Sequence, residues 1–537
     1  MQDLIDVYGR PLLQFVLNLP DGFEQPSLSP AQLEVAQILR DLCTQTADQD
    51  ENVRWLNLGS MLTGYLSEVE TSPAIYFRSQ CGGDTEIYST ETDAIGKSLQ
   101  LFARDVYAGF LVKRPMKEWY FGFHSAHYQS ANPDYLSFCN SLLRDPRLKF
   151  LFPGDMDVTA ADSFTDLIAV QSMFYTSSGS GGGLQLVSFL DNLLRVAHAR
   201  CSLSGDTSLT GFLRAALDVL EEMRELAAGR TISVPVVIGL ANVEFVDVDQ
   251  LSLGQGELRK VREGDSKYIP RADTTDALLA FEVPFKLLSK TKVPDDDSFP
   301  DFSHHLPHVE KWRNGLQEIV NRSLLAIMLA SPSGHRSAAL VISQSVFDPM
   351  SVVPRMSWQE HTPATIAEKV SITQSEAEQI HSWADRVLRE HPKNLGVAMR
   401  RIISSVGTRV DPVDGLVDAV LAWENMFSGT PETTLRVCGS LALLLEPKNF
   451  SAREVLFAEL GAIYSTRSDI VHGKANEPST VQVLQQRARA VEIAVQAMRR
   501  LYEFPDLLKA ENSSVRGKKI MLGRVLNVDD DSNVRCE

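Results

Sequence analysis

From Thr373 onward, apolar residues recur in this chain at helical spacing, and the segments that carry them are joined by short connections. Residues at positions i, i+3, i+4 and i+7 share one face of a helix, so this pattern predicts helices that each bury one side. Because short connections favour neighbouring helices that pack together, the pattern predicts an all-α bundle over residues 373–510. The expected helices cover residues 395–406, 416–427, 433–445, 451–467 and 480–502.

Local signals mark one helix start and the end of this bundle. Ser451 followed by Glu454 matches a capping box, which predicts that the fourth helix begins there. Residues 511–537 are polar and carry a basic RGKK and an acidic DDD run, so we expect a disordered tail.

Residues 1–230 mix helical and extended patterns. Ser29-Pro30 predicts the start of a helix, because serine is a good N-cap and proline suits the first helical turn. β-branched and aromatic residues over 74–77 and 119–123 predict strands. The run TSSGSGGG at 176–183 has the composition of a flexible surface loop. We therefore expect a mixed α/β region over residues 1–230.

A β-rich segment follows two amphipathic helices that we expect at 184–199 and 209–228. Residues 231–249 are rich in β-branched side chains, which predicts strands, and a further helix is expected at 308–330. Residues 231–365 are either a separate unit or continuous with the first region. The predicted fold class is α+β, with a large mixed α/β N-terminal region followed by an all-α C-terminal bundle.

Charge is distributed unevenly along the chain. The chain has 52 Lys+Arg and 69 Asp+Glu, which gives a formal net charge of −17. From residue 380 onward there are 21 basic and 20 acidic residues, so this part has a balance of +1 and residues 1–379 have a balance of −18. A negative chain is unsuited to coating nucleic acid, but the C-terminal part allows a local contact with RNA. The pairs Arg400-Arg401 and Arg499-Arg500 either line such a path or lie on solvated helix faces.

The spacing of cysteine and histidine gives little sign of a disulfide framework or a metal site. The six cysteines lie far apart with no C-x-x-C pair, so we expect reduced and mostly buried thiols. His304, His305 and His308 could bind a metal near Asp295–Asp297, although a solvated loop is the simpler interpretation. We expect no metal and no cofactor.

The sequence also lacks signals for a membrane. No window approaches the ~18 consecutive apolar residues that a membrane-spanning helix needs. The N-terminal residues carry early acidic side chains and lack the basic segment and cleavage site of a secretory signal. We expect a cytoplasmic protein with no membrane partner.

Arg467 and His472 are the best candidates for catalysis. An arginine and a histidine at a helix end can converge on one phosphodiester if the helix loosens there, and Gly473 is suited to end a helix. Imidazole exchanges protons near neutral pH, and guanidinium stabilises the negative charge of a phosphorus transition state. The pair predicts RNA cleavage by attack of a ribose 2′-hydroxyl on its own phosphate, without a metal ion.

The spacing of these two residues is uninformative by itself. Two other pairs in the chain, Arg355/His361 and Arg386/His391, have a similar spacing, which is close to what chance gives. Only Arg467/His472 closes an amphipathic helix inside the expected bundle, so the structural context and not the spacing supports this pair.

Three runs around this pair carry a family resemblance. Residues 414–473 contain GLVDAVLAWENMF, TLRVCGSLALLL and VLFAELGAIYSTRSDIVHG. They resemble the HEPN superfamily, specifically the Apea-like HEPN domains of bacterial proteins, over roughly residues 390–505, and most closely in RSDIVHG. The resemblance implies a small helical bundle that pairs with a second copy, so that two R-x4–6-H motifs line one cleft. It also implies a metal-independent endoribonuclease.

The resemblance assigns roles residue by residue. Arg467 and His472 become the catalytic pair, and Ser468 takes the polar place after the arginine. Glu424 matches the family's acidic residue on the second helix, where it would orient Arg467 or His472. Trp423 departs from the family, which usually has a smaller apolar residue at this position.

Two functions remain open. The first is a cytoplasmic endoribonuclease of bacterial antiviral defence, or a toxin, that acts as a homodimer or higher homo-oligomer. Its N-terminal region would restrain it until a trigger, such as a phage-derived one, releases it. The second is a non-catalytic dimerisation or RNA-binding module. In that case Arg467 pairs with Asp469 or Glu424, and His472 caps the helix.

Overall fold

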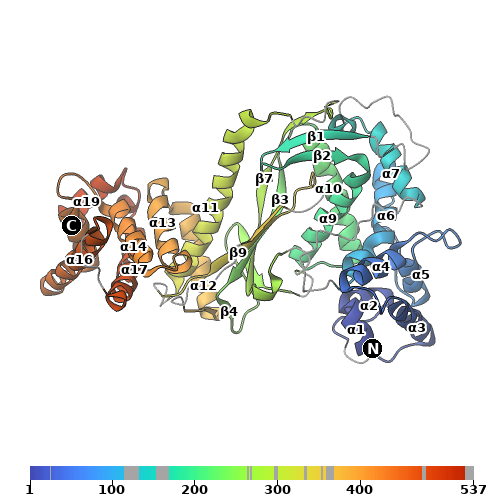
Figure 1. The fold of residues 1–537 in the computed structure, drawn as a ribbon, viewed down its shortest axis with the longest axis horizontal. Helices are drawn as coiled ribbons and strands as arrows, with labels where there is room; N and C mark the ends of the chain where they lie inside the picture. The colour runs from blue at the N-terminus through green and yellow to red at the C-terminus, as the bar shows by residue number, and fades with distance from the viewer. Residues whose placement is uncertain are drawn as a thin grey trace, which may run out of the picture.

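The computed structural model is elongated, with the N-terminal helices at one end, the C-terminal helices at the other and a sheet between them (Figure 1). It describes the chain apart from residues 24–25, 114–131, 153–166, 168–169, 263–264, 266–268, 295–299, 332–335, 352–354, 359–367, 474–478 and 526–537. Over the described residues the protein is mixed α/β, with 18 α-helices. None of those helices combines the length and the apolar character that crossing a bilayer requires.

The N-terminal end of the molecule is built from helices. Their bounds are α1 Gln2–Tyr8, α2 Arg10–Val16, α3 Pro30–Gln45, α4 Glu51–Thr63, α5 Pro73–Gln80, α6 Ala94–Leu111 and α7 Pro133–Arg144, followed by the short 3-10 helix η2 Leu148–Leu151. The start expected at Ser29 is confirmed. The Ser29 hydroxyl accepts a hydrogen bond from the backbone N–H of Gln32 (3.3 Å), and the Gln32 side chain accepts one from the N–H of Ser29 (2.9 Å).

The strand expected at 74–77 is wrong, because these residues lie in α5. Pro73 occupies the first turn of this helix, while Ala74 and Ile75 are buried. A short apolar run fits a strand and a buried helix equally well, and here the proline was the better signal. The strand expected at 119–123 lies outside the described residues. Within the described part of residues 1–151 the regular elements are helices, and the described strands of the region 1–230 lie within residues 171–185.

The glycine-rich run at 176–183 is a β-hairpin and not the flexible loop that we expected. β1 (Gln171–Thr176) pairs antiparallel with β2 (Gly181–Gln185), and β8 (Leu287–Thr291) pairs antiparallel on the other side of β1. A Cβ on Gly181 would lie 2.7 Å from Cδ2 of Tyr175, which is closer than real Cβ contacts come. Glycine therefore serves close packing at this position as well as flexibility.

A six-stranded antiparallel sheet forms the centre of the molecule, in the order β10-β9-β3-β7-β6-β5. β3 starts at the β-rich segment that the sequence predicts. The strand bounds are β3 Ile232–Ala241, β5 Gln250–Ser252, β6 Gly256–Lys260, β7 Ala277–Phe285, β9 Leu340–Val346 and β10 Arg355–Trp358. A separate parallel pair joins β4 (Val243–Phe245) to β11 (Val370–Ile372).

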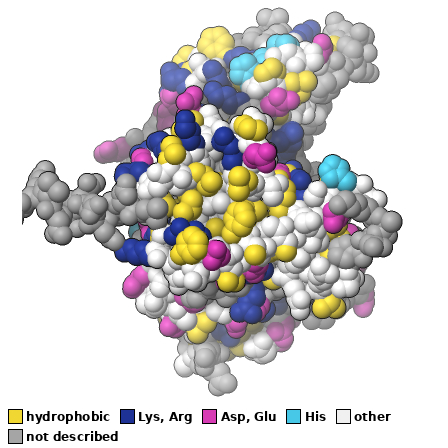
Figure 2. Space-filling model, turned by 90° about the vertical axis from the view of Figure 1, so that its left-hand side faces the viewer, with side chains coloured by type: hydrophobic (Ala, Val, Ile, Leu, Met, Phe, Trp, Pro, Cys, Tyr) yellow, Lys and Arg dark blue, Asp and Glu magenta, His cyan; other side chains and the backbone are white. Residues whose placement is uncertain are grey.

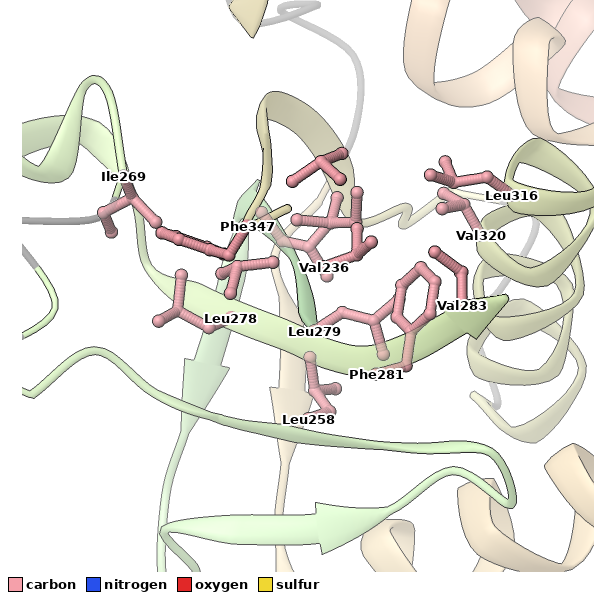
Figure 3. Packing of buried hydrophobic residues seen from close by; sticks show 14 of the residues in the cluster. Val236, Leu258, Ile269, Leu278, Leu279, Phe281, Val283, Leu316, Val320 and Phe347 are labelled. Atoms are coloured by element: carbon pink, nitrogen blue, oxygen red, sulfur yellow. The ribbon is translucent and has the colours of Figure 1, made fainter. Parts of the chain in front are cut away.

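Helices cover both faces of this sheet. The two helices before β3, α9 (Leu186–Ser204) and α10 (Leu209–Ala227), lie on one face, and α11 (Leu306–Ala330) lies on the other (Figure 1). These three helices were expected from their periodicity and are confirmed. Figure 3 shows Val283 of β7 beside Leu316 and Val320 of α11, all of them buried. The sheet thus buries apolar side chains on the side that faces α11.

The C-terminal end of the molecule consists of helices in its described residues. They are α12 Gln374–Glu390, η6 Lys393–Leu395, α13 Gly396–Ile403, the π-helix η7 Ser404–Thr408, α14 Pro412–Phe427, α15 Thr433–Leu445, α16 Phe450–Val471, α17 Thr480–Glu503, α18 Pro505–Leu508 and α19 Ser513–Met521. The five expected helices are present as α13 with its flanking turns, α14, α15, α16 and α17. The sequence reasoning did not identify α12 as a separate helix.

The tail expected to be disordered at 511–537 is in part a packed helix. α19 begins at the N-cap Asn512, whose side chain accepts a hydrogen bond from the N–H of Val515 (3.0 Å). Arg516 and Ile520 are fully buried. A Cβ on Gly517 would lie 2.9 Å from the carbonyl oxygen of Phe427, so the glycine lets α19 approach the end of α14 closely. The sequence did not indicate this helix because it lacks an apolar face, and two of its three buried residues are arginine and glycine.

Candidate functional site at the end of helix α16

Helix α16 carries both candidate catalytic residues near its C-terminal end. It is capped at its start by Asn449, whose side chain accepts a hydrogen bond from the N–H of Ala452 (3.0 Å). The start expected at Ser451 and the end expected at Arg467 are therefore wrong. The helix continues to Val471, His472 is its C-cap, and Gly473 takes a left-handed conformation with φ of +63°. Gly473 ends the helix, as the sequence suggested, about one turn beyond the last helical residue expected at Arg467.

Arg467 lies on the side of α16 that packs against α14. Its Nη2 atom is 3.4 Å from Oε2 of Glu424, and the two side chains are 17% and 20% exposed. The Nε atom of Arg467 is buried and has no hydrogen-bond partner among the described residues. The structure thus brings Arg467 and Glu424 together, and it encloses the unpaired Nε atom, so an anion from outside would have to bind the terminal nitrogens of the guanidinium.

Tyr464 completes this cluster and was missed from the sequence. Its hydroxyl donates a hydrogen bond to Oε1 of Glu424 at 2.5 Å, so the two carboxylate oxygens contact different side chains. Burial, together with this hydrogen bond to Glu424, raises the pKa of Tyr464 to about 12. Tyr464 therefore remains a protonated donor at neutral pH. The sequence could have indicated Tyr464 by its position three residues before Arg467, because residues at this spacing lie on the same side of a helix.

His472 lies apart from this cluster. It is exposed, and its ring makes no hydrogen bond or ion pair within the described part of the chain. Five residues of α-helix turn by roughly 140° beyond one full circle, so His472 and Arg467 leave α16 on different sides. Ser468 is half-buried, and its carbonyl oxygen accepts the N–H of His472 at 3.0 Å. Within one chain, the structure does not direct the two motif residues at a common point.

The exposed side of α16 carries small residues, with the carboxylate of Glu454 one turn before Ala458. Ala458, Ala462 and Ser465 are exposed along it, and His472 follows Ser465 by seven residues, which returns to the same side of a helix. Figure 2 views the molecule from its C-terminal end and shows hydrophobic side chains gathered there, with Lys and Arg around them. The exposed large hydrophobic residues of this end are Val397, Val410, Leu435, Phe450, Val455, Phe457, Val471, Val481, Met521 and Leu522.

One arginine of each basic pair that was considered as an RNA path makes an internal contact. Arg401 forms an ion pair with the buried Asp418. Arg499 donates hydrogen bonds to the carbonyl oxygens of Leu329 (2.9 Å) and Ser331 (2.5 Å) at the end of α11. Arg401 is 38% exposed despite its ion pair, and Arg499 faces the end of α11, so an RNA path along these residues stays a prediction. Charged side chains near helix ends often serve the fold in this way.

No group of three or more His, Cys, Asp or Glu side chains within the described residues is arranged to hold a metal ion. His304 and His305 have ring centroids 3.9 Å apart in a 3-10 turn before α11, and Asp295–Asp297 lie outside the described residues. The five cysteines that the structure describes are free thiols, three of them buried.

Comparison with protein-family models, with curated proteins and with solved structures gave no match for this chain.

Proposed function

We propose that this chain is a metal-independent endoribonuclease of the HEPN type, with Arg467 and His472 as its catalytic pair. One observation carries the proposal. The RSDIVHG segment, which resembles the HEPN motif, ends helix α16, and Glu424 of α14, which accepts a hydrogen bond from Tyr464, holds the Arg467 side chain of that segment. A positioned guanidinium with unused donors suits a phosphate group.

The reaction we propose is internal transesterification. The 2′-hydroxyl of a ribose attacks the adjacent phosphorus, the bond to the 5′-oxygen of the next nucleotide breaks, and a 2′,3′-cyclic phosphate forms. His472 accepts the proton of the 2′-hydroxyl, and the motif histidine of a second copy protonates the leaving 5′-oxygen. Arg467 stabilises the charge on the phosphorus transition state.

The scheme requires a second copy of the chain, because Arg467 and His472 diverge within one copy. The exposed side of α16 supports self-association, since its apolar and small side chains resemble a packing surface more than a solvated one. Pairing near the C-terminal end of α16 would put both His472 side chains into one cleft, and each Arg467 side chain would have to turn away from Glu424 to reach the same cleft. In this proposal the homodimer is the active unit.

The biological setting is also part of the proposal. We infer a cytoplasmic enzyme of bacterial antiviral defence, or a toxin, whose N-terminal region restrains the nuclease. The balance of −18 over residues 1–379 supports restraint by repulsion of RNA, until a trigger such as a phage-derived molecule changes the arrangement.

Cleavage of total RNA in the presence of EDTA, with mapping of the new ends, tests the nuclease. Wild type should leave 2′,3′-cyclic phosphate ends, and Arg467→Ala or His472→Ala should reduce the rate by about 100-fold or more, as expected for loss of a general acid–base or charge-stabilising group. Arg389→Ala and His381→Ala are matched controls, because both residues are exposed on α12. Cleavage that persists in both motif variants would contradict the proposal.

A non-catalytic dimerisation or RNA-binding module is the second candidate. It is favoured by the ion pair that already neutralises Arg467 and by the divergence of Arg467 and His472. RNA binding by the wild type without cleavage, unchanged by His472→Ala, would support this function instead.

A further inference from the structure

A preformed apolar groove lies between the end of β7, the start of β8 and the first half of α11. Its volume is about 340 Å³, within the range typical of small-molecule sites. Figure 3 shows two of the side chains beside it, Val283 and Leu316. The apolar side chains that line it are those of Val283, Phe285, Leu288, Trp312, Leu316 and Ile319.

The walls of this groove are held without a ligand. The indole N–H of Trp312 donates a hydrogen bond to the carbonyl oxygen of Pro284 at 2.7 Å, which fixes the ring against β7. Two hydrogen bonds of 2.9 Å join Ser177 to Lys286 at the mouth. The backbone N–H of Lys286 donates to the Ser177 hydroxyl, and the backbone N–H of Ser177 donates to the carbonyl oxygen of Lys286. A groove with fixed walls loses little entropy when it binds.

The rim of the groove is positive. Lys286, Lys311 and His308 line it, and its described lining contains no Asp or Glu. The two lysines are exposed and make no ion pair within the described part of the chain. Unpaired cations beside an apolar groove favour an anion with an apolar body, because the anion gains both contacts in one site.

In a second cleft of the molecule the arginine side chains are already paired with carboxylates. It lies between α9, α10 and the other face of the sheet and has a volume of about 890 Å³. Its arginines are already occupied, Arg200 by Glu222 at 2.7 Å and Arg214 by Asp206 at 2.7 Å. The positive charge that is available to an anionic ligand is therefore at the α11 groove and not in this cleft.

We propose that the groove between β7 and α11 binds a small amphiphilic carboxylate, with its apolar body against Trp312 and Leu316 and its carboxylate at Lys286 and Lys311. This inference is independent of the nuclease. The site would bind its ligand whether or not the chain cleaves RNA.

Isothermal titration calorimetry of the full chain with decanoate tests this site. We expect binding of one decanoate per chain, and binding weaker by about tenfold or more for decan-1-ol and for decylamine, which lack the anionic group. Equal binding of decylamine and decanoate would overturn the proposal, as would no binding of decanoate.

Two variants locate the binding. Gly315 lines the groove on α11, and a Cβ there would meet nothing within 4 Å, so Gly315→Leu should fold normally and fill the groove. We expect Gly315→Leu to abolish decanoate binding and Lys286→Gln with Lys311→Gln to weaken it by about tenfold. Lys393→Gln, an exposed lysine on η6, is the control. Binding that persists in a folded Gly315→Leu protein, checked by its thermal unfolding, would overturn the assignment.

Discussion

Arginine side chains near helix ends, buried or half-buried, donate hydrogen bonds to backbone carbonyl groups across this protein. Arg516 reaches Leu507 and Met426 at 2.8 Å each, and Arg322 reaches Leu388 at 2.7 Å. The last carbonyl groups of a helix have no partner within the helix, so a guanidinium with five donors is well suited to them. At the residue scale, these arginines tie helices of different segments together through backbone groups.

His391 lies at one of these contacts and makes the stability of the fold dependent on pH. It is buried, its Nδ1 atom lies 2.8 Å from the hydroxyl of Tyr502, and Arg322 donates to its carbonyl oxygen. Burial, with the nearby Arg322 charge, lowers the pKa of His391 to about 4 from the ordinary 6.5. Between these two values the unfolded chain binds a proton that the folded chain does not, so stability falls as the pH drops.

We therefore expect the free energy of unfolding to decrease by about 2 kcal/mol through this residue between pH 7 and pH 5. Urea unfolding of wild type and His391→Gln at both pH values measures this decrease. The glutamine variant has no group that titrates at this position, so its free energy of unfolding should fall less. His381→Gln, an exposed histidine on α12, should behave as wild type. Parallel pH profiles for wild type and His391→Gln would show that the burial of His391 has no such effect.

At the scale of elements, the sequence predicted helices well where apolar periodicity was long. α10 and α17 were located to within a residue or so, since each presents a continuous apolar face. The two elements assigned wrongly, α5 and α19, are stabilised by contacts with other segments, which their own sequences do not indicate. α5 resembled a strand because it is short, and α19 resembled a disordered tail because its burial rests on arginine and glycine.

The candidate site was partly predictable for the same reasons. Arg467, His472 and the terminating Gly473 were found from the sequence, and Glu424 came from the resemblance. Tyr464 was missed because a tyrosine on an amphipathic helix reads as an ordinary core residue. The divergence of Arg467 and His472 was missed because the helix was expected to end at Arg467, whereas it continues to Val471.

The hairpin of β1 and β2 gives a prediction at this scale. A Cβ on Gly181 would contact the Tyr175 ring, which is itself stacked on Phe302 with 4.8 Å between ring centroids and cannot easily move. We expect Gly181→Ala to lower the free energy of unfolding by about 1–3 kcal/mol through overpacking. Gly182→Ala is the matched control, since a Cβ there meets nothing within 4 Å and should change stability by less than about 1 kcal/mol. Urea unfolding compares the two, and equal stabilities would contradict the packing argument.

At the scale of the whole molecule, the acidic excess and the exposed apolar side chains of α16 lie in different parts of the chain. The acidic excess belongs to residues 1–379, whereas the exposed apolar side chains of α16 gather at the C-terminal end (Figure 2). Mutual repulsion between the acidic parts favours contact through the opposite end of the molecule. Association between copies is therefore expected at the C-terminal end.

Ala458→Arg tests this arrangement. The residue is exposed on α16, so the substitution should leave the fold intact while it places a charge in the middle of the proposed contact. We expect a dimer for wild type and a monomer for Ala458→Arg in light scattering after size exclusion. Leu33→Arg, which changes an exposed leucine of α3 at the other end of the molecule, should remain dimeric. A dimer that survives Ala458→Arg would place the contact elsewhere.

Helix α11 lies between the central sheet and the C-terminal helices (Figure 1). Its 25 residues form a rod about 37 Å long. Its first half forms one wall of the apolar groove, and Arg499 of α17 holds its last carbonyl groups. Because Arg499 holds the end of this stiff helix, we expect a tilt of α11 at the groove to displace α17 as well. The sheet region and the C-terminal helices consequently share one mechanical element, and neither can shift far without straining the other.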